Sequence, residues 1–272
     1  MECIHGKRSY QLDRDAFLDR IRSYDQILID IGTGDGRFVA RGCLERPRAY
    51  FVGLDPCREN MCRLSGRAAL NGLFVAASLE TLPLELCATA TRLTVRFPWA
   101  ALLRGLLDPE SEAWRSLTKA GTSRHRLELT VNAGALEEVA GLDLDEGMHR
   151  IRLAALLAGY SFESERRLDR AALVSMPSTW GKRLAFGRKP VAVSLDLRYP
   201  QSEDEPGHDP GSSYLVIIIF SFRLTQHHGR HLRPRASGFT KPGRALRTSA
   251  GRIEPLRRAC RRHDNSQEPS FS

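Results

Sequence analysis

The chain has 272 residues, of which 42% are hydrophobic, so a globular fold with a sizeable core is expected for most of it. The formal net charge of +9 comes entirely from residues 223–272, which hold 12 Lys/Arg against three acids, whereas residues 1–222 hold 29 of each sign. Bulk charge therefore does not make the folded part a nucleic-acid binder, and any binding face must come from local clusters of cations.

Strands and helices are predicted to alternate along the first 200 residues. A hairpin is predicted over residues 4–12. The apolar patterns predict helices over 14–24, 37–45, 59–71 and 149–160, and strands over 26–32, 49–55, 73–78, 91–97, 125–131, 162–168 and 191–199, with a helical stretch between the last two strands. This alternation predicts an α/β fold with a doubly wound, mostly parallel sheet and helices on both faces.

The composition changes after Pro200. Residues 1–200 are expected to form the folded domain. Residues 201–272 are expected to be a disordered basic tail, because they cannot bury enough apolar surface to offset the entropy of ordering. HHGRH at 227–231 has no acid or cysteine near it, so no metal site is expected there.

Three features indicate the compartment. The six cysteines form no CxxC pair, which argues against zinc and against a disulfide framework. The start MECIHGKRSYQL has no apolar region typical of a signal peptide. The longest apolar run, YLVIIIF, is far shorter than the roughly 20 residues that cross a bilayer. We therefore expect a cytoplasmic protein with reduced thiols and no membrane partner.

The stretch IDIGTGDG follows a predicted strand and opens a predicted helix, which is the arrangement of a ligand-binding loop. Its spacing is GxGxG, whereas a dinucleotide site has GxGxxG. Asp30 precedes the loop and Asp35 lies inside it. Two carboxylates repel a diphosphate but suit the ammonium group of an amino acid, which favours S-adenosylmethionine (SAM) over NAD. The loop glycines are Gly32, Gly34 and Gly36.

An acid at the end of the next predicted strand supports this interpretation. Asp55 lies 21 residues after Gly34, where a carboxylate accepts hydrogen bonds from ribose hydroxyls. The turn AASLETLP closes the third strand of the sheet, and its Ala77 and Leu79 are placed to cover an adenine ring. The alternative is that the glycine loop is only a tight turn between a strand and a helix.

The fourth strand ends in RFPWAALL, which supplies Phe97, Pro98 and Trp99. A Pro-aromatic motif at this place is typical of enzymes that methylate a ring nitrogen. N1 of adenine has an in-plane lone pair and needs no strong base, so the requirement is to hold the base flat and in line with the methyl donor. An aromatic ring does this by stacking. The alternative for Trp99 is a core tryptophan.

The stretch STWGKRLAFGRK at 178–189 combines two aromatic residues with four cations. It fits either a core helix with a wet face or a surface that binds something flat and anionic. Leu184 and Phe186 are expected to pack into the fold. The cations expected to meet phosphates are Lys182, Arg183 and Arg188.

Taken in order, IDIGTGDGRF, GLDPCRENM, LETLP, FPWAALL and STWGKRLAFGRK resemble the 16S rRNA (adenine 1408-N1)-methyltransferases, which are aminoglycoside-resistance enzymes. The resemblance covers residues 1 to about 199. It implies a class I SAM-dependent methyltransferase fold with an N-terminal hairpin and a late antiparallel strand. It also implies the 30S subunit as substrate, the decoding-site adenine as target and a monomeric enzyme.

The resemblance further implies roles for single residues. Trp99 and Trp180 would sandwich the flipped adenine, and Phe97 and Pro98 would complete the catalytic motif. Lys182, Arg183 and Arg188 would contact rRNA. The cosubstrate would be held by Asp30, the glycine loop and Ser178 at its methionine end, by Asp55 at its ribose, and by Ala77, Leu79 and Glu80 nearby.

The chain departs from the family pattern at three places. Ala100 and Ala101 stand where the family usually has Gly followed by Ser or Thr, the linker GRAALNG is short, and the tail has no counterpart. Two alternatives therefore stay open. One is a methyltransferase for tRNA or a small molecule. The other is a non-catalytic relic that binds SAM or RNA.

Overall fold

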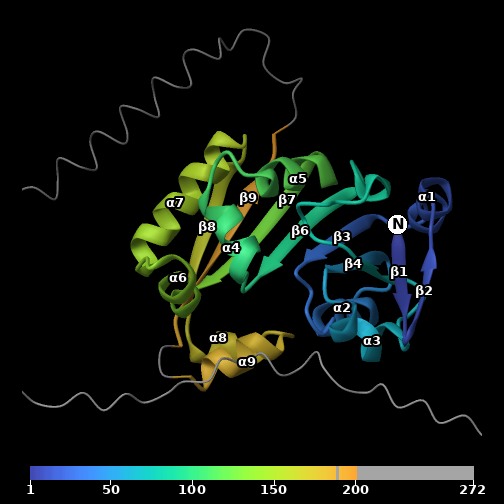
Figure 1. The fold of residues 1–272 in the computed structure, drawn as a ribbon, viewed down its shortest axis with the longest axis horizontal. Helices are drawn as coiled ribbons and strands as arrows, with labels where there is room; N and C mark the ends of the chain where they lie inside the picture. The colour runs from blue at the N-terminus through green and yellow to red at the C-terminus, as the bar shows by residue number, and fades with distance from the viewer. Residues whose placement is uncertain (188–189, 201–272) are drawn as a thin grey trace, which may run out of the picture. The chain divides into compact units, whose positions relative to one another are not determined.

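The computed structural model describes residues 1–187 and 190–200 (Figure 1). The strands are β1 (Glu2–His5), β2 (Arg8–Gln11), β3 (Gln26–Ile31), β4 (Ala49–Asp55), β5 (Gly72–Ala76), β6 (Ala90–Arg96), β7 (Gly121–Asn132), β8 (Ser161–Leu168) and β9 (Ala192–Arg198). The α-helices are α1 (Arg14–Ile21), α2 (Arg37–Glu45), α3 (Arg58–Ser65), α4 (Ala100–Leu107), α5 (Glu112–Ala120), α6 (Ala133–Ala140), α7 (Leu144–Leu157), α8 (Arg170–Ser175) and α9 (Thr179–Ala185), with a 3-10 turn at Leu84–Leu86.

These strands form one sheet in the order β2-β1-β5-β4-β3-β6-β7-β9-β8. The central strands from β5 to β7 are parallel, and β9 lies antiparallel between β7 and β8. The hairpin β1–β2 extends the other edge, antiparallel to β5. The predicted α/β fold is confirmed, including its late antiparallel strand and its N-terminal hairpin.

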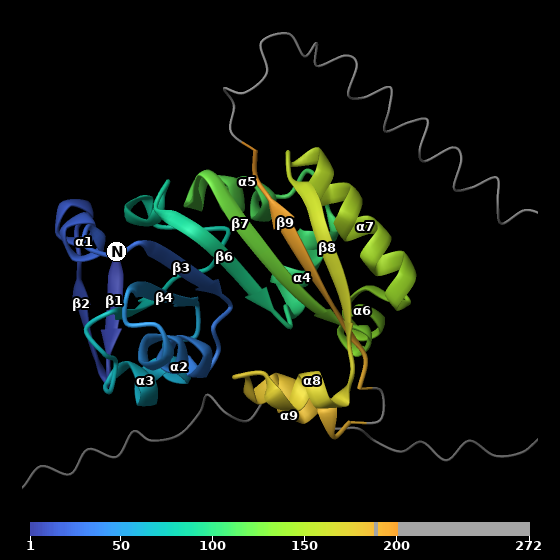
Figure 2. The same ribbon diagram turned by 180° about the vertical axis from the view of Figure 1, so that it is seen from behind.

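Helices cover both faces of the central strands, which is why β3 and β4 are almost continuously buried. Along β3 the side chains alternate between two cores. Ile27, Ile29 and Ile31 pack with α1, α4, α5, α6 and α7, whereas Leu28 packs with α2 and α3. Figures 1 and 2 show α4–α7 gathered on one face of the half formed by β6 to β9.

Besides shifted ends of α1, β7 and α7, two parts of the secondary structure differ from the prediction. Helix α3 ends at Ser65 rather than at residue 71, because the chain turns back at Gly66 and is fixed by Asn71. The buried Asn71 amide donates to the carbonyl oxygens of Cys43 and Ala49 at 3.1 and 2.9 Å. Helices α4, α5 and α6 were not predicted, although the buried residues of α5 do recur at helical spacing.

Strands β3, β4, β5 and β6 run in one direction, so their carboxyl ends meet at a single edge of the sheet. The chain leaves β3 toward one neighbour and later enters β6 on its other side, so this edge contains the point where the strand order reverses. Ligands in open α/β sheets bind in the crevice at such a point. The fold therefore places the candidate site among the loops that follow these four strands.

A buried histidine, His125, stabilises the amino-terminal half of β7. The His125 side chain is fully buried, its Nε2 lies 2.7 Å from the Tyr160 hydroxyl, and its Nδ1 lies 2.7 Å from the carbonyl oxygen of Thr122. Its ring stacks on Tyr199 with 5.0 Å between the ring centres. Burial lowers the pKa of His125 below its ordinary value, because the charged imidazolium is poorly solvated there.

We expect the free energy of unfolding to fall as the pH is lowered from 7 toward 5. The unfolded chain protonates His125 near its ordinary pKa of about 6.5, whereas the folded chain resists protonation. This contribution is fully present above that pH and is lost as the pH falls through the lower folded-state pKa. Urea unfolding of wild type and His125→Asn across this range measures it, and identical pH slopes in the two proteins would contradict the expectation.

Candidate functional site

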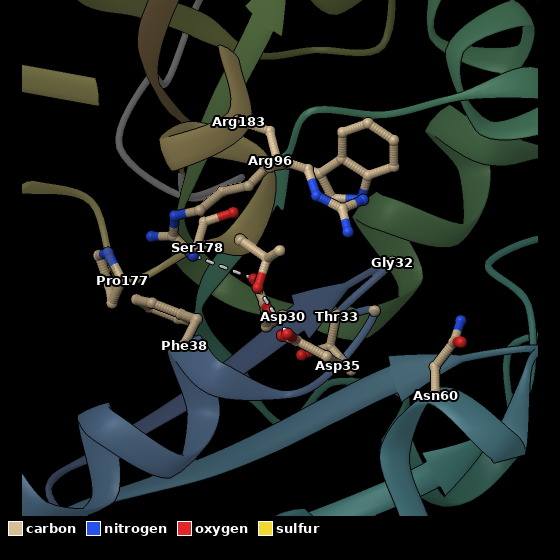
Figure 3. A pocket seen from close by; sticks show the side chains of 13 residues that line it. Asp30, Gly32, Thr33, Asp35, Phe38, Asn60, Arg96, Pro177, Ser178 and Arg183 are labelled. Atoms are coloured by element: carbon tan, nitrogen blue, oxygen red, sulfur yellow. Dashed lines mark hydrogen bonds and ion pairs between the residues drawn. The ribbon is translucent and has the colours of Figure 1, made fainter. Parts of the chain in front are cut away.

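The loops at the carboxyl edge enclose two adjoining cavities of about 340 and about 360 Å³. The first lies between the glycine loop and the segment that enters α9 (Figure 3). The second lies between the glycine loop, the end of β4 and the turn after β6. They are one divided cleft, since both are lined by Gly32, Gly34, Asn60, Arg96 and Trp180.

The glycine loop follows β3 and opens α2. Gly32, Gly34 and Gly36 have φ of 68°, 58° and 74°, a conformation that favours glycine. A Cβ at Gly36 would lie 2.3 Å from Cε1 of Phe74, so no larger residue fits there. A Cβ at Gly34 would meet no described atom within 4 Å, so a ligand can approach the backbone closely at that point.

Asp55 ends β4 beside this loop. Its Oδ2 accepts a hydrogen bond from the Gly34 N–H at 2.8 Å, and its Oδ1 accepts one from the Cys57 N–H at 2.9 Å. Burial raises the pKa of Asp55, while these two N–H groups act in the opposite direction. Each oxygen keeps a lone pair for a hydroxyl donor. Ala77, Leu79 and Glu80 line the same cavity, as the sequence predicted for the turn after β5.

Asp30, at the end of β3, is almost fully buried and is held by two neighbours on β6. The Thr94 hydroxyl donates to its Oδ1 at 2.6 Å, and Arg96 pairs with the same oxygen at 3.0 Å. Burial raises the pKa of Asp30, and the charge of Arg96 acts against that rise. The guanidinium also lies 3.5 Å from the centre of the Phe38 ring and 3.5 Å from Glu128.

Arg96 was missed by reading the sequence. Its signal was a charge at the carboxyl end of a predicted central strand, two residues after Thr94 and therefore on the same face. A buried cation needs a carboxylate partner. The sequence alone did not say that this partner was Asp30, because the two residues are 66 positions apart.

Trp99 and Trp180 come together above the cleft, although 80 residues of sequence separate them. Their ring planes differ by 11° and their centres are 6.5 Å apart, with about half of each side chain exposed. One aromatic ring between two others needs about 7 Å, at roughly 3.5 Å per carbon contact. The distance of 6.5 Å between the ring centres is thus close to the separation of two rings with one base stacked between them.

The motif before Trp99 is sharply bent. Phe97 and Ala100 have φ of 54° and 48°, a left-handed conformation that is unfavourable for residues other than glycine. The Phe97 side chain is buried against α8 and α9, in a small cluster with Leu173 and Ala185. Pro98 and Trp99 line the second cavity. The bend therefore directs Phe97 inward and leaves Trp99 at the cleft.

In the stretch that begins at Ser178, some side chains pack into the fold and others are exposed. Ser178 caps α9 by accepting a hydrogen bond from the Gly181 N–H at 3.3 Å, and it lines the first cavity. Arg183 lies over the Trp180 ring, 5.5 Å from its centre.

Leu184 packs as expected. The expectation for Phe186 was wrong: it lies beyond the end of α9 and is 77% exposed. Arg188 and the tail lie outside the described residues.

Lys182 points to a different hollow, which it shares with Pro177 and Ser178. This hollow, of about 340 Å³, adjoins the cleft and carries further cations from α2 and α3. They are Arg37, Arg41 and Arg63. This hollow therefore adds cations next to the first cavity, although Arg37 and Arg41 are paired with Asp35 and Glu45.

The cleft suits the amino-acid and nucleoside parts of SAM. The Thr33 hydroxyl is buried and acts with Arg96 and Thr94 against the rise in the Asp30 pKa. Among the described residues, no histidine lines either cavity. Across residues 1–187 and 190–200 no three His, Cys, Asp or Glu side chains cluster as metal ligands do, and no helix there is long and apolar enough to cross a bilayer.

A mostly parallel sheet in this order, with β9 antiparallel between β7 and β8, a GxGxG loop after β3 and a buried acid ending β4, is the arrangement of a class I SAM-dependent methyltransferase. The comparisons make the class specific. The family model described as "NpmA: 16S rRNA (adenine(1408)-N(1))-methyltransferase" matches residues 2–198. The chain belongs to this family.

Individual relatives agree with the family model. A protein from Escherichia coli named 16S rRNA (adenine(1408)-N(1))-methyltransferase is 27% identical over 207 residues, which cover 70% of this chain and 94% of the relative. The crystal structure of the antibiotic-resistance methyltransferase Kmr has a TM-score of 0.63 at 29% identity, covering 75% of this chain and all of the other.

A third comparison bears on the fold alone, since the identity is only 23%. It is a mutant of the 16S rRNA (adenine(1408)-N(1))-methyltransferase from Catenulisporales acidiphilia, solved with the cosubstrate SAM. The TM-score is 0.66, and the match covers 75% of this chain and 99% of that chain. The two proteins thus share the same fold.

We expect Arg96→Met to lower the free energy of unfolding by about 3 kcal/mol at pH 7, because it leaves the buried Asp30 carboxylate without its cation. Urea unfolding measures the loss. Arg41→Met breaks an exposed pair with Glu45 and should change the same quantity by less than about 1 kcal/mol. The double variant Asp30→Asn, Arg96→Met should recover most of the loss. Equal effects of the two single arginine variants would contradict this.

Proposed function

We propose that this chain transfers the methyl group of SAM to N1 of adenine 1408 of 16S rRNA. The observation that carries the proposal is the pair of parallel tryptophans, 6.5 Å apart, at the mouth of a cleft lined by the glycine loop. A small-molecule methyltransferase does not need Arg183 over the Trp180 ring or the cations of the adjoining hollow. An NAD-dependent enzyme is disfavoured because the carboxylates of Asp30 and Asp35 at the glycine loop would repel the diphosphate of the dinucleotide.

The chemistry asks for alignment rather than for a strong base. When bound, SAM supplies an electrophilic methyl group on a sulfonium. The N1 lone pair of adenine attacks this carbon, the N1–C bond forms as the S–C bond breaks, and the bond electrons return to sulfur. No proton leaves N1, and the positive charge moves from sulfur to the base. A cleft without histidine is sufficient for this step, provided that the base is held flat.

Trp99 and Trp180 would provide that flat slot. Each side chain is about half exposed, which is unfavourable for a ring of this size unless something stacks on it. Base–aromatic stacking is worth about 1–3 kcal/mol per base. Because the ring centres are slightly nearer than two stacked contacts require, the two walls would move apart a little when the base enters.

The cosubstrate would occupy both cavities, with its nucleoside in one and its methionine end in the other. Asp55 would accept hydrogen bonds from the ribose hydroxyls, with Ala77, Leu79 and Glu80 near the adenine ring. Asp30, the glycine loop and Ser178 would face the methionine end in the other cavity. The two parts meet at Gly32 and Gly34, which line both cavities and would lie beside the middle of the molecule.

Docking would use the cations beside the slot. Arg183 lies against Trp180, and Lys182 lies with the α2 and α3 arginines in the adjoining hollow. From the sequence alone, Arg188 is proposed as a further phosphate contact. Assembled 30S particles would be the substrate, with residues 1–200 acting as the catalytic domain of a monomeric cytoplasmic enzyme.

Reverse transcription on treated 30S particles tests the function. Because N1 methylation blocks base pairing, we expect primer extension to stop at adenine 1408 after incubation with enzyme and SAM. Particles incubated without SAM are the control. Full read-through, together with normal SAM binding by calorimetry, would indicate a relic that has lost turnover. Methyl transfer into tRNA instead would point to a different substrate.

Trp180→Ala tests the slot. We expect methylation to fall by roughly 5- to 150-fold, the equivalent of the 1–3 kcal/mol of one base–aromatic stack, while the Kd for SAM changes less than twofold. Isothermal titration and primer extension measure the two effects. Phe186→Ala is the matched control, since it removes an exposed aromatic ring from the same segment. Loss of SAM binding in Trp180→Ala would make the tryptophan part of the cosubstrate site.

A further inference from the structure

The segment that carries Trp180 is attached to the rest of the domain through α8 and α9. On one side Leu173 and Ala185 pack on Phe97, next to the motif that carries Trp99. The approach is close, since a Cβ at Gly181 would lie 3.1 Å from the carbonyl oxygen of Leu173 and 3.5 Å from Cε2 of Phe97. This contact connects α9 to the other wall of the slot.

A second attachment runs to the glycine loop. The Thr179 hydroxyl donates to Oδ2 of Asp35 at 2.6 Å, across 144 residues of sequence. Figure 3 shows the loop with Asp35 and the segment with Pro177 and Ser178 facing the same cavity. Asp35 is itself fixed by Arg37, whose Nε lies 3.0 Å from its Oδ2. Thr179 immediately precedes Trp180.

The Thr179 hydroxyl is not needed to begin the helix. Ser178 already caps α9 through the Gly181 N–H. The bond to Asp35 is therefore an additional, charge-assisted contact, and bonds of this kind are stronger than neutral ones. It fixes the first residue of a seven-residue helix whose next side chain, Trp180, is 57% exposed and has few other restraints.

We propose that the Thr179–Asp35 hydrogen bond links the cosubstrate loop to the base slot, so that Thr179 is a positioning residue for Trp180. The proposal rests on the function proposed above. A ligand that orders the loop at Gly34 also fixes the adjacent Asp35, and Asp35 holds the start of α9. Because such coupling is reciprocal, a base held by Trp180 would in turn favour the ordered loop. SAM binding would thereby prepare the slot for the adenine.

The experiment compares Thr179→Val, which keeps the shape but removes the hydroxyl, with Thr179→Ser, which keeps the hydroxyl. In the full chain with SAM and 30S particles, we expect kcat to fall about tenfold in the valine variant and to be largely restored in the serine variant. The Kd for SAM measured without RNA should stay within twofold, because the reciprocal effect on the loop requires a base held by Trp180. Amide hydrogen exchange with SAM alone should show added protection over 179–185 in wild type and in Thr179→Ser, but not in Thr179→Val.

Wild-type kcat together with wild-type protection in Thr179→Val would overturn the proposal. Should that variant fail to fold, Asp35→Ala at saturating SAM replaces it, because alanine has no acceptor for the Thr179 hydroxyl, and unchanged protection there overturns the proposal equally. The exchange measurement needs no RNA. If wild type fails to methylate 30S particles, the proposed function fails, while SAM-dependent protection of α9 still decides whether the link exists.

Discussion

The pairing of β3 with β4 on one side and β6 on the other is the constraint on which the rest of the site depends. It brings three carboxyl ends to one edge, where Asp30, Asp55 and Arg96 lie within one cleft. The cost of burying the Asp30 carboxylate is offset by the charge of Arg96 and the Thr94 hydroxyl, both supplied by β6. Without that strand pairing the carboxylate would be buried with no partner.

The site separates two tasks that have different physical requirements. In the proposed function, cosubstrate binding would use backbone N–H groups and buried acids on the parallel core, where the glycine loop is fixed by the bond from Gly34 to Asp55. Base binding would use large exposed rings on shorter elements, one after β6 and one on α9. The rigid part can hold a small molecule accurately, while the outer part can adjust to a base that enters from a large RNA.

Local motifs made much of the site predictable. The glycine loop, Asp55 and the FPW motif follow the ends of buried strands, and the order of those strands is regular enough to bring them to one edge. Prediction was weaker where tertiary contacts decide the outcome. Helix α3 stopped early because Asn71 is tied to carbonyls of another segment. Phe186 was expected to pack because of its side chain, yet α9 ends before it and leaves it exposed.

By itself, the sequence determined the sheet, the loop at its switch point and the residue types available for binding, because these follow from periodicity and from glycine or acid positions close in the chain. Only the tertiary structure decided which distant residues meet. The spacing of the tryptophan pair, the ion pair of Asp30 with Arg96 and the bond from Thr179 to Asp35 each join segments more than 60 residues apart. Such contacts depend on how the strands and helices pack, and no local pattern specifies them.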